Sequence, residues 1–290
     1  MERVIFKCEV ITPMFLAGAD GKTPELRPPS IKGALRFWWR ALYGNLSLKE
    51  LKETEADIFG GSEKSEGKSL VIIGIKKTLK EKFFFSPVPH KGTSNIEAFC
   101  PGGNQEFELY LGLRNNYQID NRTFNLEKLK TLFILFSILG GLGKRTRRGF
   151  GCFRIKEIDN APFTFEFSED NILKLIKSVN PEFAWHSIFT NSNYPYLMEV
   201  KIGDGTPEYS ELLTRIGRAT HKPLDKNDGS LGYALGQNRF SSPIYVTTMF
   251  NENLYYPIIS ILNAIDAKGK NLNNTEFQKD FISEVLHNEK

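Results

Sequence analysis

The sequence has few of the residues on which disulfide frameworks and metal sites are built. Its 290 residues include three cysteines, Cys8, Cys100 and Cys152, which lie far apart and form no C-x-x-C pair. This pattern argues against a disulfide framework or a zinc site, and it predicts buried thiols in a reducing compartment. The four histidines are scattered without H-x-x-H or H-E-x-x-H spacing. We therefore expect no metal centre.

Two further absences narrow the function. Residues 140–146 contain Gly, Lys and Thr but lack the spacing of a phosphate-binding P-loop, and residues 203–207 do not match a dinucleotide fingerprint. The longest apolar stretch, residues 132–139, is interrupted by Ser137 and is too short to cross a bilayer. Residues 1–10 alternate like a strand and lack the apolar run of a signal peptide. The sequence predicts a cytoplasmic protein with no cofactor and no membrane association.

The composition is that of a globular protein with one acidic partner. Hydrophobic residues make up 40% of the chain and charged residues 25%, and 23 of the aromatic residues are Phe. A sizeable core is therefore easy to build. The formal net charge is only +4. A moderate excess of this size fits one basic surface better than a general coat of positive charge.

Hydrophobic periodicity predicts an α+β fold made of two ferredoxin-like (RRM-like) domains, antiparallel sheets with helices on one face. The first domain, residues 1–160, shows the order β-α-β-β-α-β, with strands at 3–11, 69–76, 105–113 and 150–158 and helices at 30–43 and 125–139. Ser30 is the expected N-cap of the first helix. Residues 83–104 are expected to form a long loop.

The second domain, residues 161–290, approximates the same unit in a shorter form. A connection at 161–195 carries one short helix, at 170–178. The expected elements that follow are a strand at 196–202, a helix at 208–220, strands at 243–250 and 254–261, and a helix at 275–286.

Residues 139–154 are the strongest functional signal. Glycines alternate there with Lys144, Arg145, Arg147, Arg148 and Arg154, and the stretch has no carboxylate. Glycines let the backbone approach a ligand, and several cations can meet a curved phosphate backbone together. We expect RNA contacts from Gly141, Gly143, Lys144, Arg145, Arg147 and Arg148. The alternative is a solvated basic turn.

A second cationic segment lies at residues 27–42. Lys32, Arg36 and Arg40 recur every four residues and would form one stripe of a helix. Trp38 belongs to the apolar face, whereas Trp39 lies at the margin and either packs in the core or stacks on a base. The expected RNA contacts in this segment are Arg27, Ser30, Lys32, Arg36, Trp39 and Arg40. We expect both cationic elements, about nine cations in all, to converge on one cleft and to bind RNA mostly through its phosphates.

The residues needed for catalysis are sparse. His90 lies in a Pro-rich loop, and His221 follows a predicted helix beside Lys222. Either could serve as the general acid or base of a metal-independent RNA cleavage. The sequence shows no complete catalytic constellation, so no catalytic residue is assigned.

Three motifs resemble one family. Residues 27–42, R-P-P-S-I-K-G-A-L-R-F-W-W-R-A-L, look like a signature of the RAMP superfamily of CRISPR proteins, and in particular of the first-numbered Cmr subunit of type III-B effector complexes. Residues 140–151 resemble the glycine-rich loop of that superfamily. The run Arg239-Phe-Ser-Ser-Pro-Ile resembles a C-terminal motif of the same subunit and adds Arg239 to the expected RNA contacts.

The resemblance implies two ferredoxin-like domains and a role in antiviral defence. It implies a non-catalytic subunit of a ribonucleoprotein that holds the 3′ region of guide RNA (crRNA) or the target RNA paired there. The implied partners are the other Cmr subunits, especially backbone RAMP proteins. Some members of the superfamily process guide RNA with a catalytic His, so an endoribonuclease that processes CRISPR transcripts is the alternative. A general binder of single-stranded RNA outside any complex is a third possibility.

Overall fold

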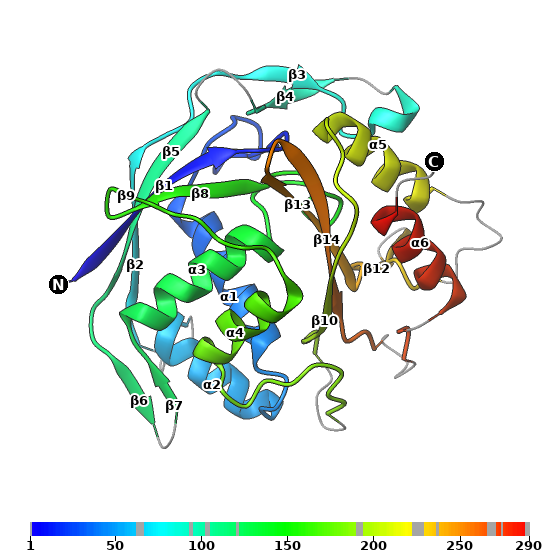
Figure 1. Cartoon of the computed structure of the whole chain (residues 1–290). Coiled ribbons are helices and arrows are strands. Elements are labelled where there is room, and N and C mark those ends of the chain that lie inside the picture. Colours follow the sequence, from blue (N-terminus) through cyan, green and yellow to red (C-terminus); the bar gives the residue numbers. More distant parts are fainter. Residues whose placement is uncertain are drawn as a thin grey trace.

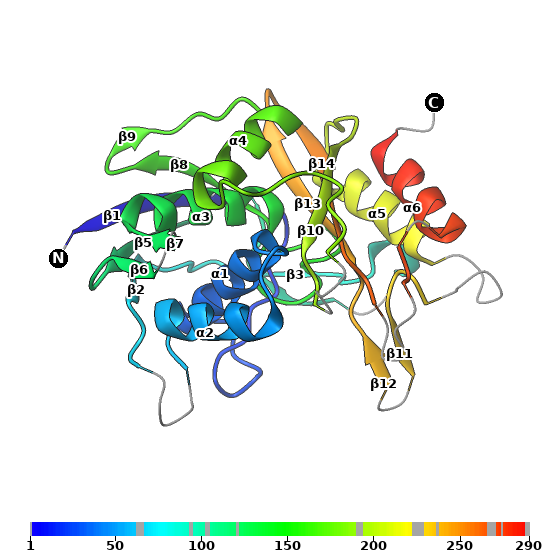
Figure 2. The ribbon, with the colours of Figure 1, turned by 90° about the horizontal axis from the view of Figure 1, so that it is seen from below.

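The chain forms two α+β units that pack as alternating layers of sheet and helix (Figures 1 and 2). The computed structural model describes residues 2–61, 67–92, 95–101, 105–119, 122–189, 194–221, 229–235, 238–265, 271–273 and 275–287. Within these residues, no helix is long and apolar enough to cross a membrane.

The N-terminal sheet has the strand order β2-β5-β1-β8-β9. Its strands are β1 (Arg3–Val10), β2 (Val71–Lys77), β5 (Glu106–Leu113), β8 (Phe153–Ile158) and the short β9 (Ala161–Pro162). The helices α1 (Pro28–Leu42) and α3 (Leu126–Leu139) pack on one face of the sheet. The third long strand lies beside the first, as in a ferredoxin-like fold, which confirms the predicted fold class.

Helix α1 begins earlier than the sequence predicted. Arg27 occupies the N-cap position with an extended backbone, and its side chain makes no capping hydrogen bond. Pro28 and Pro29 fill the first turn, where the missing N–H groups need no partner. The prediction of Ser30 as N-cap is therefore wrong, and Ser30 is instead an exposed residue of the first turn.

Several elements of the N-terminal unit were not predicted. Helix α2 (Leu48–Phe59) starts with a capping box in which Ser47 and Glu50 bond to each other's backbone N–H, a signal that the Ser-Leu-Lys-Glu sequence carries. The expected loop at 83–104 contains a short hairpin and a 3-10 turn. The small elements are β3 (Phe83–Phe85), η1 (Pro89–Lys91), β4 (Ile96–Ala98), β6 (Tyr117–Ile119) and β7 (Arg122–Phe124).

The connection between the units packs on the N-terminal unit. Strand β9 pairs with β8, and helix α4 (Glu169–Val179) packs against α3. We therefore propose that the second unit begins near β10 (Leu197–Ile202), later than the boundary at residue 160 that the sequence suggested.

The C-terminal unit is a shorter form of the same fold. Its sheet has the order β10-β14-β13, which is the ferredoxin-like order of a first, third and second strand, and the described residues contain no fourth strand after the last helix. Its remaining elements are α5 (Tyr209–Thr220), β11 (Tyr233–Leu235), β12 (Asn238–Phe240), β13 (Ile244–Asn251), β14 (Leu254–Leu262) and α6 (Glu276–Leu286).

Both faces of the C-terminal sheet are buried, which explains the nearly continuous apolar runs of β13 and β14. On one face the Thr247 hydroxyl donates a 2.7 Å hydrogen bond to the Ile138 carbonyl at the end of α3. On the other face, Val246 and Ile259 join the core formed with Phe281 of α6. Helix α3 is thus shared by the two sheets.

Candidate nucleic-acid interface

The glycine-rich loop, residues 139–154, runs from α3 to β8 between the two units (Figure 1). Gly143 has φ +95°, and a Cβ added there would overlap the carbonyl of Phe15. The same carbonyl accepts a 2.9 Å hydrogen bond from the backbone N–H of Lys144. Only glycine therefore permits the close approach that fixes this turn against the segment after β1.

A cavity of about 380 Å³ lies where this loop meets the start of α1. Ser30 and Ala34 line it from the helix, and Gly141, Gly143 and Lys144 line it from the loop. Ser30 and Lys144 are exposed, so a hydroxyl and an ammonium group face the solvent at this place. The structure therefore brings the start of α1 and the glycine-rich loop together, as the sequence predicted.

Arg147 and Arg148 do not take part in an open basic surface. The Arg148 guanidinium donates hydrogen bonds to the carbonyls of Leu231 and Ile244 and to the Ser242 hydroxyl, at 3.0–3.2 Å. Arg147 donates to the carbonyl of Ser242. Burial lowers the pKa of Arg148 to about 10. Both side chains bind the C-terminal unit, so in this structure they do not form the open RNA-binding surface that the sequence suggested.

The backbone of the loop explains why these arginines point into the protein. Arg148 forms an isolated parallel bridge with Val246 of the edge strand β13. Gly149 N–H donates to the Val246 carbonyl at 2.8 Å, and Val246 N–H donates to the Arg147 carbonyl at 3.3 Å. Sequence reasoning could not find this pairing because it joins residues about a hundred positions apart.

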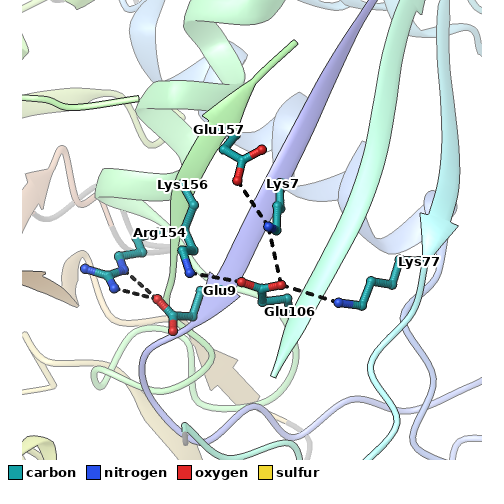
Figure 3. A network of polar contacts seen from close by, with 7 residues as sticks. All are labelled: Lys7, Glu9, Lys77, Glu106, Arg154, Lys156 and Glu157. Atoms are coloured by element: carbon teal, nitrogen blue, oxygen red, sulfur yellow. Dashed lines mark hydrogen bonds and ion pairs between the residues drawn. The ribbon is translucent and has the colours of Figure 1, made fainter. Parts of the chain in front are cut away.

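Arg154 belongs to an ion-paired face of the N-terminal sheet, shown in Figure 3. Its guanidinium binds Glu9 at 2.6 Å and 2.7 Å. Beside this pair, Glu106 contacts three lysines, Lys7, Lys77 and Lys156, at 3.0–3.7 Å. Acids and bases alternate on this face, so it is no basic surface, and Arg154 is no part of one.

The cations of the α1 stripe have polar partners within the protein, with one carboxylate shared by two arginines. Arg36 Nε lies 2.6 Å from Glu55 Oε1 of α2, and Arg40 contacts the same carboxylate, whose side chain is only 8% exposed. Lys32 Nζ donates to the Ser69 hydroxyl at 2.9 Å. Lys32, Arg36 and Arg40 do not line the cavity at the glycine-rich loop, so the expected convergence of the two sets of cations is not found there. Helix α2, which was not predicted, supplies one counter-charge for the two arginines.

Both tryptophans of α1 are core residues. Trp38 and Trp39 are each 1% exposed, and the Trp39 ring packs on Tyr43 with centroids 4.7 Å apart. The packing interpretation of Trp39 is confirmed, and stacking on a base is excluded in this conformation because neither face of the ring is open.

Three of the remaining expected contacts have side chains that reach the surface. Arg27 is partly exposed at the start of α1 and lies 3.8 Å from Glu25. Arg145 is half-buried with φ +62°, and its guanidinium lies over the Phe150 ring. Arg239 is exposed on β12 and does not line the cavity. The basic surface at the cavity is thus smaller than the sequence suggested, with Lys144 at its centre.

The structure also joins two residues that the sequence treated separately. The rings of His90, from η1, and His221, at the end of α5, lie with centroids 4.5 Å apart. The two histidines come from different units of the chain, and no spacing in the sequence indicates their contact. Within the described residues, no group of three His, Cys, Asp or Glu side chains is placed to hold a metal ion.

The family model and the related sequences that match this chain indicate the same family. The RAMP superfamily model matches residues 7–154, a segment that ends with the glycine-rich loop. The CRISPR system Cmr subunit Cmr1-2 of Pyrococcus furiosus is 30% identical over 189 residues, covering 54% of this chain and 96% of the relative. The subunit Cmr1-1 of the same organism is 28% identical over 197 residues, covering 62% of this chain and 58% of the relative.

Solved structures share the fold across the whole chain. The apo crystal structure of Cmr1 from Pyrococcus furiosus matches with a TM-score of 0.61 at 18% identity, covering 98% of this chain and 96% of that chain. A chain of the type III-B Cmr-beta complex bound to cognate target RNA, solved by cryo-EM, matches with a TM-score of 0.58 at 14% identity, covering 98% of this chain and 99% of that chain.

Proposed function

Since the chain belongs to the RAMP superfamily, we propose that it is a non-catalytic RNA-binding subunit of a type III-B CRISPR (Cmr) effector ribonucleoprotein in the cytoplasm. It holds the 3′ region of guide RNA, or the target RNA paired there, and it assembles with other Cmr subunits, especially backbone RAMP proteins. The named Cmr relatives and the likeness to a chain of a complex that contains target RNA support this assignment.

The observation that carries the proposal is the cavity between α1 and the glycine-rich loop. Lys144 supplies an exposed ammonium group, Ser30 supplies a hydroxyl, and Gly143 exposes backbone without a side chain, whereas Gly141 lines the cavity but is buried. These are the groups that proteins use to position a phosphate backbone. Gly33, one turn after Ser30, adds an exposed helix position at which a Cβ would meet no other atom. A strand can therefore approach this end of α1 closely.

The histidine pair does not have the arrangement of a ribonuclease centre. Cleavage by an acid–base pair requires one group at the attacking 2′-hydroxyl and another at the leaving oxygen. His90 and His221 touch each other, with ring centroids 4.5 Å apart, which leaves no room for a phosphodiester between them. This contact favours the binding function over the endoribonuclease alternative.

A charge reversal at the cavity tests the proposal. The variant Lys144→Glu should lose at least about tenfold in affinity for single-stranded RNA, because a carboxylate would repel the phosphates. Lys177→Glu is the matched control, since Lys177 is an exposed lysine of α4 and is no part of the cavity. Equal binding by both variants would contradict the site. Native copurification of the chain without guide RNA and Cmr subunits would contradict the assignment to a complex.

A further inference from the structure

The contact between His90 and α5 links the two units of the chain. The turn η1 follows strand β3 of the N-terminal unit and lies against α5, where it is the cyan turn beside the yellow helix in Figure 1. The His90 ring packs there on His221, with an angle of 46° between the two rings. His221 Nδ1 lies 3.0 Å from the Gly217 carbonyl. Two imidazoles thus meet at the junction of the units, near Arg145 of the glycine-rich loop.

Helix α5 has a glycine at the point where the His90 ring packs on it. Gly217 lies in the interior of the helix and is buried, although glycine is among the poorest helix formers. A Cβ at this position would overlap Nδ1 of His90 and would lie 2.8 Å from its Cε1. Glycine at this position therefore lets the imidazole ring pack directly on the helix backbone.

The groups around this ring have unused hydrogen-bonding capacity. Both ring nitrogens of His90 are shielded from solvent and have no hydrogen-bond partner within the described residues, and the same is true of Arg145 Nε. An unpaired buried N–H group is costly, and oxygen acceptors would satisfy Arg145 Nε–H and the one N–H of neutral His90, or both N–H groups of the protonated ring. The arrangement therefore has room in its hydrogen-bonding pattern for a ligand that brings oxygen acceptors.

The charged side chains around His90 indicate that such a ligand would be an anion. Four side chains from three segments act on His90, namely His221 and Arg218 of the α5 region, Lys91 of η1 and Arg145 of the glycine-rich loop. All four carry positive charge when protonated. Burial, with these charges, lowers the pKa of His90 below its ordinary value of 6.5. His90 is therefore uncharged at neutral pH unless an anion arrives.

We propose that His90, His221 and Arg145 form a subsite for one phosphodiester of the bound RNA strand, which binds more tightly as the pH falls. The proposal rests on the proposed RNA-binding function. Arg145 stands between Lys144 and Thr146, which both line the cavity, so a strand that leaves the cavity along the loop reaches the pair. A phosphodiester keeps its single negative charge between pH 5 and pH 8, so the pH dependence comes from His90.

A pH-dependent binding measurement tests the subsite. Fluorescence anisotropy with a labelled single-stranded RNA, at constant ionic strength, should show an affinity at pH 5.5 at least about threefold higher than at pH 8, because binding takes up a proton. The variant His90→Gln should lose this gain and keep its affinity at pH 8 within about twofold. Gly217→Ala should do the same, because its methyl group displaces the ring while favouring the helix. Circular dichroism verifies the fold of each variant.

His287→Gln is the control. His287 is exposed at the end of α6, where Nδ1 lies 3.5 Å from Asp204, and its replacement should leave the gain intact. A wild-type affinity that does not change with pH, or a gain that persists in His90→Gln, overturns the proposal while RNA binding at pH 8 stands. A wild type that binds no RNA at either pH overturns the proposed function as well. A higher melting temperature with inorganic phosphate, without any gain in RNA affinity at pH 5.5, would mean that the histidine pair binds a free anion. This result would also overturn the proposal.

Discussion

Arg148 and Val246 form a parallel backbone bridge that joins the glycine-rich loop to the edge strand of the other unit. The guanidinium of the same arginine binds carbonyls on the C-terminal side, and it lies 5.4 Å from the centroid of the Phe281 ring. The loop is therefore part of the core between the units. The packing of the two units determines the conformation of the loop. It thereby also restrains the exposed part of the loop near Lys144.

Removing the Arg148 guanidinium should destabilise the protein. Arg148→Ala leaves the Leu231 carbonyl without its guanidinium donor, and an unsatisfied buried group costs about 1–3 kcal/mol. The Ile244 carbonyl keeps the hydrogen bond from the Ser242 hydroxyl. We expect the free energy of unfolding to fall by about 1–3 kcal/mol in urea denaturation. Lys144→Ala, on the exposed part of the same loop, should change it by no more than about 0.5 kcal/mol. Equal effects of the two variants would contradict the assignment of Arg148 to the core.

Trp39 should behave as a core residue. Trp39→Ala removes a ring that is 1% exposed and should lower the free energy of unfolding by about 3–5 kcal/mol, as Trp38→Ala should. Thermal melts together with RNA titrations provide the measurement. A normal melting temperature combined with a lost affinity for RNA would mean that the ring faces the ligand, contrary to the structure.

The ion pairs on the open sheet face predict sensitivity to acid (Figure 3). Hydrogen bonding and charge from Lys156, with Lys77 and Lys7, hold the pKa of Glu106 below its ordinary value of 4.5. A carboxyl with a lowered pKa stabilises the fold above its unfolded-state pKa, and this contribution is lost as the pH falls through the folded-state pKa.

The variant Glu106→Gln should therefore be less stable than the wild type at pH 7, and the difference should shrink below pH 4.5. Urea titrations across this range provide the measurement. Glu127→Gln is the control, because Glu127 is an exposed carboxylate whose ion pair with Lys130 lies on the surface of α3. A difference between Glu106→Gln and wild type that stays constant across the range would argue against the Lys–Glu network.

The affinity for RNA should depend on salt less steeply than nine cations would imply. A single strand gives a log–log slope of about −0.7 per phosphate neutralised. With Lys144 at the cavity, Arg27 at the N-cap of α1 and Arg145 next to Lys144 in the loop as the available cations, we expect a slope of about −2 rather than about −6. Binding titrations over a range of salt concentrations measure this slope. Release of Arg36 and Arg40 from Glu55 would steepen the slope to about −3.5, and a value near −6 would show that about nine cations bind RNA, contrary to the pairing seen in the structure.

The purified chain should not cleave RNA. Incubation with CRISPR repeat RNA in EDTA should leave the RNA intact, because His90 and His221 touch each other and cannot flank a phosphodiester. Denaturing gels provide the readout. Specific cleavage that is lost in His90→Ala or His221→Ala would favour the endoribonuclease alternative.

Local patterns in the sequence determined the α+β class and the N-terminal strand and helix order. The alternation of Val4, Phe6 and Cys8 marks a buried strand face, and all three side chains are buried against the helices. The approach of Ser30 to Gly143 also followed, because the ferredoxin-like order brings the first helix and the last loop to one place. Periodicity and turn chemistry act over a few residues, so a single chain displays them directly.

Tertiary structure alone decided which cations remain available to a ligand. Arg36, Arg147 and Arg154 look equally basic in the sequence, yet the first binds Glu55, the second binds the Ser242 carbonyl and the third binds Glu9. Each partner lies far from its arginine along the chain, and desolvation and pairing depend on distances in space. The same reason hid the contact of His90 with His221, which exists only because η1 of one unit packs on α5 of the other.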